Sequence, residues 1–203
     1  MDELYTGGST RLRLSFHTSG VGMLASTFSI QKMIIEQHPD LVIQAGIAGT
    51  FTQHLHLSQV VAVSNDCVGD IGVEEEGSFR DVFDLQLQNE NEFPFKNRKL
   101  ENPWLQQYNL VQLLEVPSVT INEISTRADR IQQLQNKYGV AIETMEGAAL
   151  HYVALLTNTP FLQVRAVSNF VGERNKQEWR MNEAIENLSA ILLQYIDKLY
   201  QLK

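Results

Sequence analysis

Two polar side chains in the last third of the sequence have the types and spacing to bind a sugar and a base. Glu146 offers a carboxylate that can accept hydrogen bonds from two neighbouring hydroxyl groups. Asn169 offers an amide that can both donate and accept. A ligand that combines a sugar diol with a heterocyclic base would use both groups, provided that the fold brings them together.

The segments around these residues predict two strands with a helix between them. Residues 141–144 are typical of a strand end, residues 147–156 of an apolar helix, and residues 161–167 of a strand covered on both faces. We expect the strands to be parallel neighbours, so that Glu146 and Asn169 follow their carboxyl ends, where ligands bind in open α/β sheets. Alternative roles are a helix cap for Glu146 and a turn for Asn169.

The remainder of the chain completes an α/β pattern. Leu12, Leu14 and Phe16 alternate with polar residues, which predicts a strand, and we expect a loose segment over residues 1–10 before it. The strand, the helix after it and the next strand should form a unit of a parallel sheet. Further strands are predicted at 41–45, 60–63 and 116–121, and helices at 21–37, 127–138 and 176–202. The chain, 1–203, is expected to form one three-layer αβα domain around a mainly parallel, twisted central sheet.

Residues 70–118 are the least regular part of the sequence. A long irregular stretch inside a compact domain is often a lid or a binding loop. Its acidic triplet, Glu74 to Glu76, is interpreted as a solvated surface. Its aromatic residues fit three roles, namely loop anchors, contacts between subunits or a wall against which a base stacks.

Composition restricts the function classes. The chain has 203 residues, 43% of them apolar, and a net charge of −8 without any basic run, which argues against a nucleic-acid partner. No signal peptide and no apolar run of about 20 residues is visible, so we expect a cytoplasmic protein without a membrane partner. The single cysteine, Cys67, is interpreted as a buried small residue.

The sequence predicts neither a metal site nor a serine nucleophile. His54 and His56 are two residues apart and have no recognisable third ligand, so surface or packing roles are expected for both. Ser19 and Ser168 have no adjacent histidine that could act as a base.

Four motifs, in order along most of the chain, resemble the nucleoside phosphorylase and nucleosidase family. They are the two glycine-rich loops at 19–22 and 44–49 and the segments at 144–149 and 164–169. Within that family, Val73–Gly77 and Ser168–Gly172 are most similar to the futalosine hydrolases, enzymes of an alternative menaquinone pathway. Small residues in the second loop, Gly46 to Gly49, are expected to let a ligand approach the backbone closely.

The resemblance implies roles for residues of this sequence. Glu146 would bind the ribose and stabilise an oxocarbenium-like transition state, and Asn169, the implied catalytic residue, would contact the purine. The implied substrate-binding residues are Thr144, Met145, Glu146, Gly46, Ile47 and Ser168. No cofactor and no metal is implied. Relatives that act on 6-aminopurines usually carry Asp at the position of Asn169, so the amide indicates a 6-oxopurine.

The implied function is hydrolysis of the N-glycosidic bond of a 6-oxopurine nucleoside. The favoured substrate is futalosine, giving hypoxanthine and dehypoxanthine futalosine. The alternatives are a methylthioadenosine/adenosylhomocysteine nucleosidase and a non-catalytic nucleoside-binding protein. Ile47 stands where relatives commonly place Ser or Thr, so water rather than phosphate is expected to be the nucleophile.

Two further expectations follow from the resemblance. The family normally opens with a strand that precedes the one predicted at 12–16 and is followed by a glutamate that activates water. This sequence is expected to lack that segment. Relatives often complete the active site with an aromatic residue of a neighbouring subunit, so a homodimer or higher homo-oligomer is expected, with the contact in residues 70–118.

Overall fold

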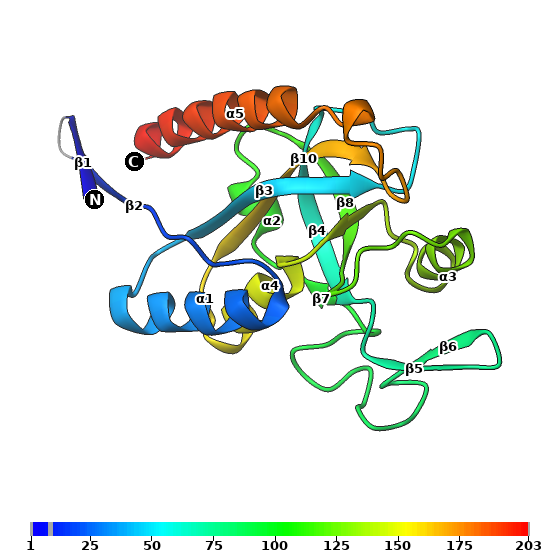
Figure 1. Ribbon diagram of the computed structural model, residues 1–203. Coiled ribbons are helices and arrows are strands. Elements are labelled where there is room, and N and C mark those ends of the chain that lie inside the picture. Colours follow the sequence, from blue (N-terminus) through cyan, green and yellow to red (C-terminus); the bar gives the residue numbers. More distant parts are fainter. Residues whose placement is uncertain (1, 8–9, 203) are drawn as a thin grey trace.

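The computed structural model describes residues 2–7 and 10–202, with side chains placed from residue 12 to residue 202. Helix α5 (Met181–Gln201) covers one face of a central sheet, and helices α1 (Met23–Gln37) and α4 (Gly147–Leu156) lie against the other face (Figure 1). This arrangement confirms the three-layer α/β architecture.

Strand β10 (Phe161–Phe170) lies between the two helical layers. Leu162, Val164 and Ala166 pack in the same apolar cluster as residues of α5, whereas Phe161 packs with residues of α1 and α4. Successive side chains of a strand point to opposite faces. The strand is therefore covered on both sides, as its nearly continuous apolar character predicts, and Gln163 faces the α1/α4 side as Phe161 does.

The central sheet is mainly parallel. Its strands are hydrogen-bonded in the order β10, β3 (Val42–Thr50), β9 (Ile142–Thr144), β8 (Leu114–Thr120), β4 (Val60–Val68) and β7 (Leu100–Glu101). The long ladders β10–β3 and β4–β8 are parallel, and the antiparallel ladders β3–β9, β10–β4 and β4–β7 are short. Because β4 also pairs with β10, the sheet curls back on itself.

The strands before Glu146 and before Asn169 are not neighbours, and that expectation was wrong. Strand β3 lies between β9 and β10, and β9 runs antiparallel to β3. The physical reason is that β9 is short: it pairs in parallel with β8, and only Gly49 and Thr50 at the end of β3 reach it.

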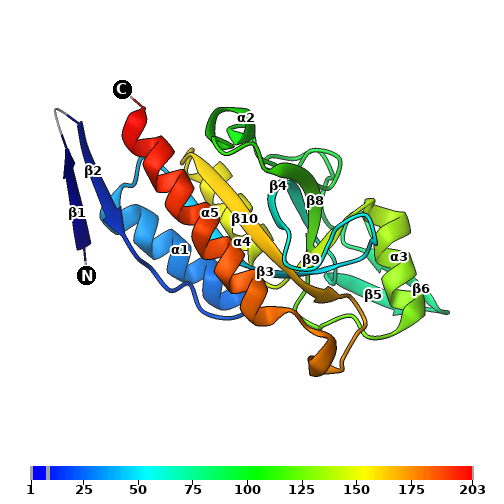
Figure 2. The same ribbon diagram turned by 90° about the horizontal axis from the view of Figure 1, so that it is seen from above.

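The beginning of the chain also differs from the expectation. Strand β1 (Asp2–Gly7) pairs antiparallel with β2 (Thr10–Ser15) in a separate two-stranded sheet, so the segment before residue 10 is not loose as a whole. Residues 1, 8 and 9 lie outside the described residues. The alternation at 12–16 predicted a strand correctly. The strand–helix–strand unit was wrong, because the partner of β2 is the hairpin strand β1, beside the end of α5 (Figure 2).

The irregular region 70–118 contains short elements that are stabilised by ion pairs and aromatic contacts. A hairpin of β5 (Gly72–Glu75) and β6 (Ser78–Asp81) exposes the acidic triplet, which confirms its interpretation as solvated surface. In the loop that follows, the ring of Phe95 meets that of Phe83 edge to face at 5.2 Å and lies 6.0 Å from the ring of Tyr152 of α4, both measured between ring centroids. These two phenylalanines therefore act as loop anchors.

The remaining helices flank the sheet. They are α2 (Leu105–Tyr108), α3 (Ala128–Tyr138) and the 3-10 helix η1 (Lys176–Glu178). The last long helix begins at Met181 rather than at 176, because the Asn175 side chain caps η1 and Trp179 is extended.

Candidate functional site

A cleft of about 260 Å³ brings together residues from all four sequence motifs. Its lining comprises Ser19, Gly20, Gln44, Ala45, Gly46, Ile47, Glu146 and Arg165. The first glycine-rich loop, strand β3, the start of α4 and strand β10 each contribute. The cleft is therefore assembled from segments far apart in the sequence.

Glu146 directs its carboxylate into this cleft rather than onto its own helix. It occupies the position before α4 but makes no side-chain capping bond. Its Oε1 accepts a hydrogen bond from the backbone N–H of Gly22 at 3.1 Å, and its Oε2 lies 3.6 Å from Nη1 of Arg165. The helix-cap interpretation of Glu146 is therefore wrong, and its carboxylate is available to a ligand in the cleft.

The hydroxyls of two threonines, and not the carboxylate of Glu146, accept hydrogen bonds from the N–H groups in the first turn of α4. The hydroxyl of Thr144 accepts from the N–H of Gly147 at 3.3 Å, and the hydroxyl of Thr120 accepts from the N–H of Ala148 at 2.8 Å. The first N–H groups of a helix lack partners within the helix. Because threonines supply these partners, the glutamate before the helix is left free.

Arg165 is a charged side chain in the core, only 3% exposed. Burial lowers the pKa of its guanidinium, and the charges of Glu146 and Asp66 raise it. An arginine stays protonated in proteins, so this buried cation needs partners. Its Nη2 donates to Oε1 of Gln44 at 2.6 Å, in addition to the ion pair with Glu146.

The second glycine-rich loop makes room for this arginine. A Cβ atom on Gly46 would lie 2.3 Å from Nη1 of Arg165. The guanidinium therefore approaches the backbone closely at Gly46, which also lines the cleft. Ile47, the next residue, lines the cleft and packs in the apolar cluster beneath α5.

Asn169 lies further along the same pair of strands. Gly46 pairs with Arg165, and Gly49 pairs with Asn169, so the two positions are three residues apart on β3, or about 10 Å. Its Nδ2 donates to the carbonyl of Phe170 at 2.9 Å, and its Oδ1 accepts from Ser168 at 2.8 Å. Asn169 is thus outside the lining of the cleft but adjoins it along β3.

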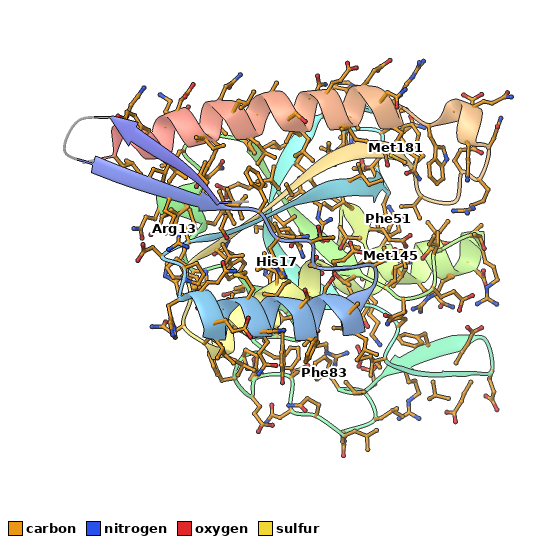
Figure 3. All side chains as sticks on the ribbon, turned by 60° about the vertical axis from the view of Figure 1, so that its left-hand side comes forward. Arg13, His17, Phe51, Phe83, Met145 and Met181 are labelled. Carbon is orange, nitrogen blue, oxygen red and sulfur yellow. The ribbon has the colours of Figure 1, made fainter. Side chains whose placement is uncertain are left out.

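The remaining implied substrate-binding residues lie away from the cleft lining. Ser168 is buried, with Oγ 3.3 Å from the carbonyl oxygen of Ala48, and Thr144, the last residue of β9, is buried and accepts from the first N–H of α4. Met145 lies towards the same end of the sheet as Phe51, the residue after β3 (Figure 3). Of the six implied residues, Gly46, Ile47 and Glu146 line the cleft.

Sequence reasoning missed Arg165 and Gln44. Both stand inside the sequence motifs, but the resemblance implies no role for either. The signal that could have identified Arg165 is a cation within an otherwise apolar strand, because such residues are rarely buried without a partner. Gln44 carries no comparable signal, since its role depends on the position of the guanidinium.

Other polar candidates have the expected structural roles. His54 and His56 are exposed, and Cys67 is buried. Within the described residues, no group of three His, Cys, Asp or Glu side chains is arranged to hold a metal ion. The helices of that same part of the chain also lack the length and apolarity needed to cross a membrane.

Comparison with known proteins relates this chain to a family. A family model described as the phosphorylase superfamily matches residues 2–197. The futalosine hydrolase of Streptomyces coelicolor is 28% identical over 150 residues, covering 74% of this chain and 62% of that relative, which is less than two thirds of its length. The 5′-methylthioadenosine/S-adenosylhomocysteine nucleosidase of Maridesulfovibrio salexigens is 22% identical, covering 96% of this chain and 86% of the relative.

Solved structures share the fold. A 5′-methylthioadenosine/S-adenosylhomocysteine nucleosidase from Colwellia psychrerythraea, in complex with adenine, has a TM-score of 0.74 at 18% identity and covers 98% of this chain and 86% of that one. The futalosine hydrolase of Helicobacter pylori has a TM-score of 0.74 at 15% identity and covers 97% and 88%. Identities this low establish the fold alone.

The close approach of Arg165 to Gly46 predicts a cost for any side chain at this glycine. We expect Gly46→Ala to lower the free energy of unfolding by about 1–3 kcal/mol, as overpacking of a core does, because the paired guanidinium has to move. Urea denaturation measures this change. Ser189→Ala on the exposed surface of α5 is the control and should be nearly neutral. Equal stability of the two variants would show that the guanidinium moves at no cost.

Proposed function

Because the chain belongs to the phosphorylase superfamily, we propose that it hydrolyses the N-glycosidic bond of a purine nucleoside. The observation that carries this proposal is the Glu146 carboxylate, which points into a cleft and is held between a backbone N–H and a buried guanidinium. A carboxylate held in this way is suited to bind two sugar hydroxyls. The relatives named futalosine hydrolase and 5′-methylthioadenosine/S-adenosylhomocysteine nucleosidase support the same reaction class.

The proposed mechanism assigns one end of the substrate to each part of the site. Glu146 accepts hydrogen bonds from the ribose hydroxyls, and its negative charge stabilises the positive charge that develops on the sugar as the bond to the base breaks. Arg165 fixes the orientation of that carboxylate. The base extends along β3 towards Asn169, whose carbonyl oxygen accepts from a protonated N7 of the departing purine.

The proposed substrate is a 6-oxopurine nucleoside, with futalosine the favoured compound. The amide of Asn169 donates its N–H to an oxygen at C6 of the purine, whereas a 6-amino group would face it with another donor. The futalosine hydrolase of Thermus thermophilus, 24% identical over 84% of this chain, adds support. The alternative is a methylthioadenosine or adenosylhomocysteine substrate, which similar relatives named for those compounds favour.

Removing the charge of Glu146 tests the proposed function. We expect Glu146→Gln to reduce the rate of base release by about 10²-fold or more, as the loss of an electrostatic stabiliser does, while the melting temperature changes little. A coupled assay for the free base measures the rate. Glu186→Gln, the same chemical change on the exposed side of α5, is the control. Unchanged kinetics in Glu146→Gln, or nucleoside binding without base release by the wild type, contradicts the proposal.

The amide of Asn169 predicts a preference among bases. An unsatisfied buried polar group costs about 1–3 kcal/mol, so the wild type should favour inosine-type over adenosine-type substrates by roughly 5- to 150-fold in kcat/KM. Asn169→Asp should narrow or reverse this ratio, because a protonated carboxyl can donate to N7 of adenine. Asn136→Asp on the exposed surface of α3 should leave it unchanged. A wild type that prefers the adenine substrate would contradict the assignment of a 6-oxopurine.

We further propose that the protein pairs with a second copy of itself through the outer face of α1. Leu24, Phe28 and Ile35 lie on one side of this helix, at spacings of four and seven residues, and are 87%, 71% and 56% exposed. The loop that carries Phe93, 67% exposed, lies on the same side of the sheet (Figure 1). Exposed apolar patches of this kind are typical of interaction sites.

A charge placed in this apolar face should prevent the pairing. We expect sedimentation at micromolar concentration to give a dimer for the wild type and a monomer for Phe28→Arg. Leu193→Arg on α5, at the opposite side of the molecule and 64% exposed, should remain dimeric. A monomeric wild type contradicts the pairing, and dissociation by Leu193→Arg alone would move the contact to α5.

A further inference from the structure

A group of buried polar residues lies behind the cleft and does not line it. Gln163 on β10, Asp66 on β4 and His151 on α4 are each 0% exposed. The group adjoins Arg165 on the same side of the sheet, between β10 and α4. Three buried polar side chains destabilise the fold unless each one is hydrogen-bonded. Their hydrogen-bond partners are therefore the parts of the structure whose positions they fix.

The hydrogen bonds of this group form a chain in which each side chain donates to the next, from Arg165 through Gln163 and His151 to the carbonyl of Leu100. Nδ1 of His151 lies 2.8 Å from the carbonyl oxygen of Leu100, which can only accept, so Nδ1 carries the proton and Nε2 is an acceptor. The amide nitrogen of Gln163, oriented to satisfy its neighbours, donates to that Nε2 at 2.8 Å and to Oδ2 of Asp66 at 3.3 Å. The Gln163 oxygen then accepts from Nε of Arg165 at 3.2 Å.

The protonation of His151 agrees with this direction. Burial lowers the pKa of His151 to about 4, so the ring is neutral at neutral pH and keeps one nitrogen free to accept. Gln163 is consequently fixed in one orientation by His151 and Asp66, with its oxygen towards Arg165. Arg165 in turn is paired with Glu146 in the cleft.

Asp66 reaches Glu146 by a second route through the start of α4. The hydroxyl of Thr120 donates to Oδ1 of Asp66 at 2.9 Å and accepts from the N–H of Ala148 at 2.8 Å. Ala148 is the second residue of α4 and Glu146 immediately precedes that helix. Asp66 therefore holds both the charged partner of Glu146 and the backbone that carries it.

The lack of a side chain at Gly147 leaves room for the carboxylate of Asp66 at the beginning of α4. A Cβ atom on Gly147 would lie 2.2 Å from Oδ2 of Asp66 and equally close to the amide of Gln163. Only glycine fits between Glu146 and Ala148 while Asp66 keeps its place. The glycine of the third sequence motif thus makes room for the side chains of Asp66 and Gln163.

We propose that Asp66 is a positioning residue for Glu146, acting through Gln163 and Arg165 on one side and through Thr120 and α4 on the other. This inference rests on the proposed nucleosidase function. Asp66 does not touch the substrate. Its two carboxylate oxygens accept from two different donors, and this pair of bonds sets the distance between the start of α4 and the guanidinium. The carboxylate in the cleft is held at the place that these two elements define.

Asp66→Asn is the first test, because an amide offers one acceptor where the carboxylate offers two. Its single oxygen takes the place of Oδ1 or of Oδ2, so its NH2 group faces either the Gln163 amide nitrogen or the Thr120 hydroxyl, which are donors to the carboxylate. We expect kcat for base release to fall by about 10- to 100-fold, the size of effect that a displacement of about 1 Å produces. KM should change by a much smaller factor, because the groups that line the cleft are retained.

A second readout does not depend on activity. The N–H of Gly22 donates to Oε1 of Glu146, so its hydrogen exchange reports where that carboxylate lies. We expect exchange at Gly22 to become faster in Asp66→Asn. Tyr195→Phe is the matched control, because it removes a buried hydrogen bond to the carbonyl of Tyr108, on the α5 side of the sheet, and should leave both readouts unchanged.

Gln163→Met supplies an independent variant that breaks only the route through Arg165, and it carries the test if Asp66→Asn does not fold. It should lower kcat and speed exchange at Gly22 in the same direction. If kcat and Gly22 exchange in these variants match those of Tyr195→Phe, or if only KM changes, the inference is overturned. If the wild type releases no base while Gly22 exchange still depends on Asp66, the positioning stands and the proposed function fails.

Discussion

The buried guanidinium of Arg165 is the constraint on which the site depends. Transfer of a cation to a protein core costs several kcal/mol unless partners compensate it. Here Glu146, Gln44 and Gln163 provide the partners, and each comes from a different segment of the chain. The absence of a side chain at Gly46 leaves room for the charge. One buried cation thereby fixes the relative positions of β3, β10 and the start of α4.

This constraint explains why a carboxylate at the start of a helix is free to bind a ligand. Threonines at 120 and 144 take over the helix N-terminus, and the backbone of the first glycine-rich loop closes on Glu146 through Gly22. The carboxylate is therefore oriented before any substrate arrives. Such preorganisation is what makes electrostatic stabilisation of a transition state effective.

Much of the fold could be predicted from local patterns. The nearly continuous apolar run at 161–167 predicted a strand covered on both faces, and β10 has that environment. The order of strands could not be predicted, because β9 is only three residues long and its neighbours depend on contacts distant in the sequence. The alternation at 12–16 likewise predicted a strand without indicating its partner.

Part of the cleft lining could be predicted from the sequence, but the residues that position it could not. Family motifs identified Glu146 and the loop at Gly46 and Ile47, all of which line the cleft. The same motifs include Thr144 and Ser168, whose hydroxyls are engaged within the protein. A motif contains residues that contact a ligand and residues that the fold requires, and the structure is needed to distinguish the two kinds. The role of Asp66 has no local signal, because it arises where β4, β10 and α4 meet.

The guanidinium of Arg165, the one basic group among the described residues of the cleft lining, is paired with Glu146. We propose on this ground that water rather than phosphate attacks the sugar. The most direct test is to identify the sugar product of the reaction by mass spectrometry, with and without added inorganic phosphate. We expect a free sugar in both cases and a rate that phosphate does not raise. A sugar 1-phosphate as product would contradict it.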